Sequence, residues 1–393
     1  MTSRESDEVM VKFFEMCHST DPELLRLPQP RRVELAGLVF HYPEALGDNA
    51  GEFLRLVRDR TRTRHEAMLP LLDANDGDLP HISGTTNAAV FEGIVTPARY
   101  FEWGGRIVRV EDSLNELLKQ TDLGLEAPCF FARIPYPAVF VEFGTSRQHD
   151  PRFDIENTES GLHAVEGAYV SEVAYVVGEH GPATETQKAL GLKDGERCRI
   201  LEITIFGSPV GKSGLLDDAS LFFSLIIRDK DEDRPLGGVL QEQLALYDRV
   251  GSGFVGYEPL SASSQLCIEA NVDHLMKALL VMNTDAVTKS ENIVFTDIKR
   301  QWERAGEKKR HKIERRMARA YDFIAVRCAS NDDGTVPSHA VSRGVAPHWR
   351  RGHIRRQRVG ENRAQTRLVW IKPCLVHGDM MATPPLRNYE LRK

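Results

Sequence analysis

The sequence has few cysteines, and their spacing limits the kinds of site it can build. Its 393 residues include 6 cysteines, with no Cys-x-x-Cys pair and no Cys/His ligand spacing. They are scattered singly among apolar neighbours: Cys17, Cys129, Cys198, Cys267, Cys328 and Cys374. We therefore expect reduced core thiols in a cytoplasmic protein, with no metal site and no cofactor.

Long apolar runs are missing too. A membrane-spanning helix needs roughly 18 or more consecutive apolar residues, and no run approaches that length. The opening segment, residues 1–8, is acidic and lacks the basic and apolar parts of a secretion signal. We expect neither a membrane partner nor export.

Charge is unevenly distributed along the chain. The formal net charge is −6, but residues 299–393 hold 23 Lys and Arg against 9 Asp and Glu, a balance of +14. That leaves 28 against 48, or −20, for residues 1–298. A basic segment of this size favours RNA or another polyanion as a partner. The alternative is a solvated face that pairs with the acidic part of the same molecule.

Apolar periodicity and turn residues predict three regions: a helical amino-terminal region (1–78), an acidic α+β body (79–298) and a basic carboxyl-terminal module (299–393). In the first region we expect helices over 6–18 and around 53–57.

The body mixes strands and helices in no regular order. A capping-box pattern from Ser113 to Glu116 predicts the start of a helix. Strands are expected over 107–110, 130–134, 138–143, 169–177, 199–206 and 221–228, and further helices over 239–247 and 272–279. This order predicts an α+β fold, a mixed sheet with flanking helices.

The basic module begins with a predicted helix over 302–321. The densest chemistry follows in the segment PHWRRGHIRRQR, residues 347–358. A strand over 367–376 closes the module. Leu368, Trp370 and Lys372 alternate in it with Val369 and Ile371, which predicts that one face of the strand packs in a core.

The pattern Pro-His-x-Arg-Arg-Gly-His, followed by a Trp-containing strand and Val-x-x-Gly, resembles the end of one anti-CRISPR family. That family blocks production of the type V-A CRISPR effector nuclease rather than inhibiting the finished enzyme. The positions that carry over are Pro347, His348, Arg350, Arg351, Gly352, His353 and Trp370. A weaker similarity covers the helix from Ser113, the run 134–142 and the helix over 236–247. Trp349 and Ile354 depart from the family's residue types.

The resemblance implies a protein of a phage or mobile element that acts during translation. It would recognise the nascent amino-terminal part of the nuclease and cause degradation of the mRNA being translated. The expected partners are therefore a nascent peptide and RNA or the ribosome.

The residues of the block also permit a catalytic interpretation. Two imidazoles, several arginines and a glycine that can bend the backbone would suit metal-independent RNA cleavage. In this hypothesis His348 and His353 are base and acid, and Arg351 or its neighbour Arg350 stabilises the charged phosphorane.

The alternative interpretation is binding without cleavage. Guanidinium groups suit phosphate, and Trp349 could stack a base or pack in a core. The predicted RNA-binding residues are Arg350, Arg351, Arg355, Arg356, Arg358, Trp349, Lys308, Lys309 and Arg310.

Three function classes thus remain open, of which we favour a binding adaptor over a ribonuclease or a plain RNA-binding regulator. Another motif is set aside: residues 206–213 contain Gly-Lys-Ser, but Phe206 stands where a phosphate-binding loop needs its first glycine.

Overall fold

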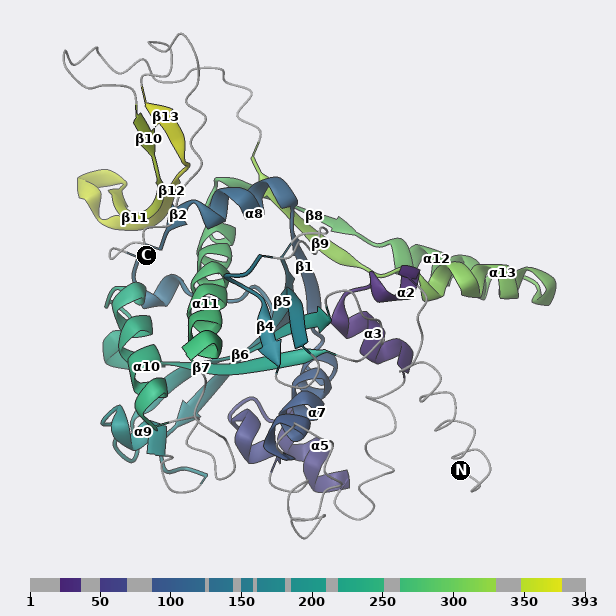
Figure 1. Ribbon diagram of the computed structural model, residues 1–393, viewed down its shortest axis with the longest axis horizontal. Coiled ribbons are helices and arrows are strands. Elements are labelled where there is room, and N and C mark those ends of the chain that lie inside the picture. Colours follow the sequence, from purple (N-terminus) through teal and green to yellow (C-terminus); the bar gives the residue numbers. More distant parts are fainter. Residues whose placement is uncertain are drawn as a thin grey trace.

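The computed structural model describes residues 22–36, 50–68, 87–123, 127–143, 150–157, 161–180, 185–209, 218–250, 262–329 and 348–376. A large mixed sheet forms its centre (Figure 1). The strands are β1 (Arg106–Val110), β3 (Ala138–Glu142), β4 (Ile155–Asn157), β5 (Gly161–Val176), β6 (Arg197–Pro209), β7 (Ala219–Arg228), β8 (Val287–Asn292) and β9 (Phe323–Cys328).

The strand order along the sheet is β7-β6-β5-β3-β1-β9-β8, with β4 paired to β5. β1 lies parallel to β3 and β9, and the other described pairs of this sheet are antiparallel. The predicted α+β fold is therefore confirmed. β9 comes from the basic carboxyl-terminal segment and lies inside the sheet, so that segment and the acidic body share a core. The three-region division stays a prediction.

Helices flank both faces of the sheet (Figure 1). The described ones are α2 (Pro22–Leu25), α3 (Gln29–Ala36), α5 (Ala50–Arg58), α7 (Asn87–Glu102), α8 (Asp112–Lys119), α9 (Glu185–Ala189), α10 (Leu236–Val250), α11 (Ala262–Met282), α12 (Val294–Glu303) and α13 (Glu307–Ala318). Within the described part of the chain, every helix is too short or too polar to cross a membrane.

β3 shows why this sheet has a core on each side. Its five residues are all buried. Val139 and Val141 pack with α8, α10 and α11, whereas Ala138 and Phe140 pack with Tyr100 of α7. Side chains alternate between the two faces of a strand, so an inner strand covered on both sides is largely apolar. The exception in β3 is Glu142, which accepts a hydrogen bond from Arg109 at 2.8 Å.

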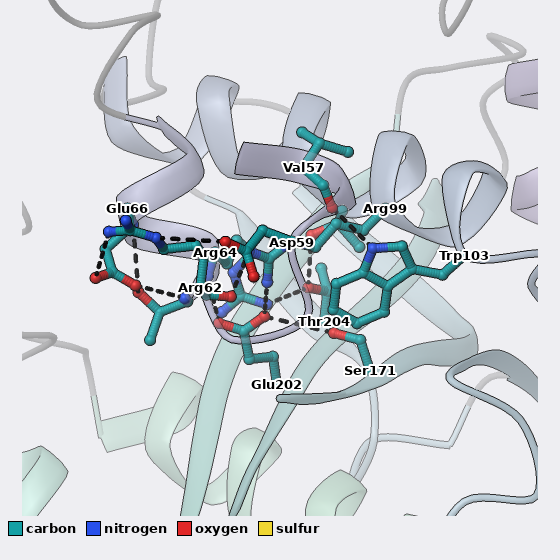
Figure 2. Close-up of polar contacts among 12 residues, drawn as sticks. Val57, Asp59, Arg62, Arg64, Glu66, Arg99, Trp103, Ser171, Glu202 and Thr204 are labelled. Carbon is teal, nitrogen blue, oxygen red and sulfur yellow. Dashed lines mark hydrogen bonds and ion pairs between the residues drawn. The ribbon is translucent and has the colours of Figure 1, made fainter. Parts of the chain in front are cut away.

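Buried charge fixes the amino-terminal helices on the sheet. Figure 2 shows Glu202 of β6 beneath α5 and α7, where it accepts hydrogen bonds from the Arg64 backbone N–H and the Arg99 guanidinium. The indole N–H of Trp103, the residue that follows α7, donates to the carbonyl of Val57 in α5, at 2.8 Å. Arg64, Arg99 and Glu202 are each almost fully buried. Such buried charges need their partners to offset the lost hydration.

One predicted strand of the body is wrong. Residues 130–134 are not a strand, because the chain makes a 3₁₀ turn at Cys129–Phe131. Arg199 of β6 donates to the carbonyls of Ala132 (2.6 Å) and Cys129 (3.0 Å). A guanidinium thus satisfies backbone groups that a neighbouring strand would otherwise pair.

Two helix boundaries also differ from expectation. α8 has Glu111 at its N-cap, with no side-chain capping bond, so Ser113 does not cap it. The single helix expected over 302–321 is two helices, because α12 ends at Glu303 and α13 begins after Gly306. Glycine is a poor residue for a helix interior. The expected helix over 6–18 lies outside the described residues.

The cysteines largely follow expectation. Cys129, Cys198 and Cys267 are free and buried, while Cys328 is only half-buried. Burial raises the pKa of each of the three buried thiols to about 12, so they stay protonated and unreactive. The side chains of Cys17 and Cys374 lie outside the described residues.

Candidate nucleic-acid interface

The carboxyl-terminal block forms short strands at one end of the molecule. β10 (His348–Arg350) pairs with β13 (Cys374–Val376), and β11 (Gly352–Val359) pairs with β12 (Gln365–Ile371). β11 also lies parallel to β2 (Thr121–Asp122), which follows α8. The single strand expected over 367–376 is therefore two strands interrupted around Pro373, which has no N–H to donate.

Gly352 holds this unit against α8 and β2. A Cβ atom on Gly352 would lie 2.6 Å from Thr121 Oγ1 and 2.7 Å from Pro373 Cδ, closer than atoms can pack. The Gly352 N–H donates to the carbonyl of Gln120 at 3.2 Å. Gly352 does not have a positive φ, so glycine is not needed here for a left-handed backbone conformation. The block needs glycine here because neighbouring chain segments approach closely.

Trp370 is a second anchor. Its indole N–H donates to Thr121 Oγ1 at 3.2 Å, and that hydroxyl donates to the Leu117 carbonyl at 2.8 Å. Trp370, Leu368 and Ile354 are all buried in the core that includes α8 and α11. The expectation that one face of the strand packs in a core is thus confirmed, and that face carries Leu368 and Trp370. Gly352 and Trp370 are two positions of the family pattern, and both have a structural role here.

The arginines of β11 lie on both faces of the β11–β12 hairpin. Arg356 and Arg358 lie on the same face as Ile354, and Arg355 lies on the other face with His353. All three arginines are exposed. Among the described residues none of the three has an ion-pair partner. The hairpin therefore presents arginines on both of its faces.

The sequence analysis did not single out two further arginines of the hairpin. Arg363 lies in the turn between β11 and β12, and Arg367 pairs with Gln357 across the hairpin. Arg367 Nη1 lies 3.8 Å from Asp285 Oδ2, but both side chains are largely exposed. In the sequence, only their closeness to the 347–358 block pointed to these two arginines, because the pairing of the strands was not known.

Arg350 and Arg351 lie where the two sheets meet, and both are exposed. Arg351 Nη1 is 3.5 Å from Asp122 Oδ1, again between largely exposed side chains. Exposed pairs of this kind contribute little and are screened by salt. A phosphate can compete for Arg351 at small cost.

The two candidate imidazoles come from different strands. His348 is in β10 and His353 is in β11, with Arg351 between the strands. His353 is half-buried, while the side chains of His348 and Trp349 lie outside the described residues. The acid-base pair and the stacking role of Trp349 stay predictions.

The basic helix lies elsewhere. Figure 1 places α13 at the far side of the large sheet from β10–β13, so the structure does not bring the two basic groups together. Lys308 and Lys309 are exposed on α13. Arg310 is half-buried, because it donates to the Ala305 carbonyl at 3.1 Å and stacks 4.7 Å from the centre of the Trp302 ring. Arg310 therefore helps to close the turn between α12 and α13.

The family model described as "AcrVA2-like: Anti-CRISPR type V subtype A2 family" matches residues 108–378. The chain belongs to this anti-CRISPR family. The match begins within β1 and ends just after β13, so it includes the docked carboxyl-terminal unit. Membership confirms the resemblance that the block at 347–353 predicts.

A search of solved structures and of curated proteins adds two findings. A structure described as "Crystal structure of AcrVA2" matches with a TM-score of 0.41 and 11% identity, covering 86% of this chain and 99% of that one. No curated protein matches.

Proposed function

We propose that this anti-CRISPR family member acts during translation of the type V-A effector nuclease. It binds the nascent amino-terminal segment of the nuclease and, through RNA contacts of its β11–β12 hairpin, causes degradation of the mRNA that encodes it. In this proposal the protein is an adaptor, and host factors cut the transcript.

The observation that supports the RNA-binding part is the exposure of Arg355, Arg356 and Arg358 on a hairpin whose base is fixed in the core. Guanidinium groups pair with phosphate oxygens through two parallel N–H bonds. Arginines on both faces let the hairpin contact a strand that passes along or around it. Anchoring by Gly352 and Trp370 lowers the entropy cost of holding the hairpin in place.

The decisive experiment compares two reporter mRNAs in a translating lysate. One encodes the amino-terminal segment of the nuclease, and the other carries compensating frameshifts, so that almost the same RNA encodes a different peptide. Adding the protein should lower the level of the first mRNA and leave the second unchanged, as measured by quantitative PCR. Equal loss of both would contradict recognition of the peptide.

Variants test the hairpin separately. Replacing Arg356 and Arg358 with Ala should abolish most of the mRNA loss without altering the melting temperature, because both side chains are exposed. The matched control replaces Arg106 and Arg197, two exposed arginines at strand starts of the large sheet. If the control variant is equally impaired, the hairpin has no special role.

The adaptor proposal also predicts a result in the absence of host factors. Purified protein incubated with RNA in EDTA should leave the RNA intact. Cleavage that disappears in His353→Ala would instead support the metal-independent ribonuclease.

A further inference from the structure

The two edge strands of the large sheet differ in what covers them. β7 forms one edge and β8 forms the other (Figure 1). At β7, the Gln243 side chain of α10 accepts a hydrogen bond from the Ile226 N–H at 2.8 Å and donates to the Ile226 carbonyl at 2.5 Å. A side chain that binds both backbone groups in this way hinders the addition of another strand. Among the described residues, none covers the edge of β8 in the same manner.

The register of β8 shows which backbone groups face its open edge. β8 pairs antiparallel with β9, and the Ala329 N–H donates to the Ala286 carbonyl at 2.9 Å in the same register. Backbone groups alternate in direction along a strand, so the even-numbered residues of β8 bond to β9. The N–H and C=O groups of Val287, Lys289 and Glu291 therefore point away from β9. Within the described part of the chain these groups form an unpaired row.

The side chains along this edge carry opposite charges. Lys289 and Glu291 lie two positions apart, so they share one face of the strand, and both are exposed. Neither has an ion-pair partner among the described residues. Ile293 and Val294, which follow β8 directly, are 42% and 48% exposed. Exposed apolar side chains beside an unpaired strand edge favour an interaction surface.

Charge makes this edge complementary to itself in one register. Two copies related by a twofold axis would pair their β8 strands antiparallel. With the axis at Ser290, Lys289 of each copy lies opposite Glu291 of the other, and the outward backbone groups meet. An axis at Lys289 or at Glu291 would oppose like charges, and an axis at Thr288 would place Glu291 opposite Asp285. Opposite charges across a strand pair stabilise it, whereas like charges destabilise it.

We infer that the β8 edge is an interface between two copies of this chain, which join their large sheets into one continuous sheet across a twofold axis at Ser290. The N–H and C=O of Lys289 bond to the C=O and N–H of the second copy's Glu291, and the axis repeats these bonds. A lone lysine discourages pairing at a strand edge, but here the glutamate two positions later provides its partner. This inference does not depend on the proposed function.

Backbone hydrogen bonds supply the affinity in this interface, and the charges select the register. Exposed ion pairs contribute little individually, and a short polar interface gives a weak dimer. Association is therefore measured by sedimentation velocity from micromolar to millimolar protein, after ribonuclease treatment so that RNA does not bridge two copies. The wild-type protein should change from monomer to dimer as its concentration rises.

Single charge reversals should weaken this association. Lys289→Glu and Glu291→Lys each turn both attractive pairs into repulsive ones, so each should raise the dissociation constant about tenfold or more. Both side chains are exposed, so both variants should fold normally. The matched control is Lys193→Glu, at an exposed position in the turn before β6, and it should dimerise like the wild type.

Mixing the two variants gives the sharpest test. The edge of Lys289→Glu carries two carboxylates, and the edge of Glu291→Lys carries two ammonium groups, so opposite charges again face each other in a heterodimer. At a concentration at which each variant alone is monomeric, the equimolar mixture should dimerise. The chain that carries both substitutions should also recover the wild-type dissociation constant, because the pairs are only exchanged.

Hydrogen exchange locates the interface. The amides of Lys289 and Glu291 should exchange more slowly at high protein concentration than at low concentration. The amides of Thr288 and Ser290 point towards β9 and should be protected at both concentrations.

A wild-type protein that stays monomeric at millimolar concentration would overturn the inference. So would a dimer that neither charge reversal weakens, or a mixture of the two variants that fails to associate. Protection of the Lys289 and Glu291 amides only by an added extended peptide would assign the edge to a peptide instead of a second copy.

Discussion

At the scale of single residues, the close approach at Gly352 gives a stability prediction. Gly352→Ala would place a methyl group 2.6 Å from Thr121 Oγ1, so strands or helix must shift. We expect a loss of about 1–3 kcal/mol in the free energy of unfolding, measured by urea denaturation. Gly238→Ala is the control, because nothing lies within 4 Å of its new Cβ in α10. It should stabilise the protein slightly.

His274 gives a pH prediction at the same scale. Its pKa is lowered from 6.5 to about 3 in the folded protein, so the unfolded chain binds a proton that the folded one does not. This residue alone should therefore reduce stability by about 1.4 kcal/mol for each pH unit below 6.5, until the folded pKa is reached. The difference in unfolding free energy between wild type and His274→Gln should follow that slope. A difference independent of pH would contradict a buried neutral imidazole.

How far residues could be predicted from the sequence depended on whether their partners were nearby. The exposed arginines of β11 followed from local composition. The role of Gly352 did not, because Thr121 is distant in sequence. Likewise, His274 and Asn115 are 159 residues apart, so no motif could reveal the hydrogen bond between their side chains.

At the scale of elements, Arg199 helps to hold the segment that follows Pro128, through hydrogen bonds to the carbonyls of Cys129 and Ala132. Arg199→Lys keeps the charge but cannot reach both carbonyls with one planar fork. We expect a loss of about 1–3 kcal/mol in stability and faster hydrogen exchange at the Ala132 amide, which closes the 3₁₀ turn. Arg197→Lys, at an exposed position of the same strand, should change neither quantity. Equal effects of the two substitutions would show that the guanidinium fork is unimportant.

Elements were predictable where burial shaped a continuous pattern. The expected strands at 199–206 and 221–228 lie within β6 and β7, and the one at 169–177 lies within β5 except for its last residue, although each observed strand is longer. Longer strands arise because paired neighbours extend the hydrogen-bond ladder past the apolar run. The segment 130–134 has equally β-prone residues, but residues distant in sequence bond its backbone: Arg199 binds the Ala132 carbonyl, and Asn283 binds the carbonyls of Phe131 and Arg133.

At the scale of the whole molecule, the sequence shows that positive charge gathers towards the carboxyl end, but it does not show where the fold places the basic groups. The chain of the basic segment returns through the large sheet as β9, and this separates α13 from the hairpin (Figure 1). Two basic sites at opposite sides of a molecule should act independently, because the free-energy changes caused by distant substitutions are additive.

The salt dependence of RNA binding measures this separation. Replacing Arg355, Arg356 and Arg358 with Ala removes up to three phosphate contacts. The negative slope of log K against log salt for single-stranded RNA should therefore become less steep by about 2. Replacing Lys308, Lys309 and Lys312 on α13 tests the other site. If a short RNA binds only the hairpin, the α13 variant keeps the wild-type slope, and only an RNA long enough to reach both sites shows a loss from each variant. A short RNA whose slope falls equally in both variants would mean that the two basic groups form one surface, contrary to this fold.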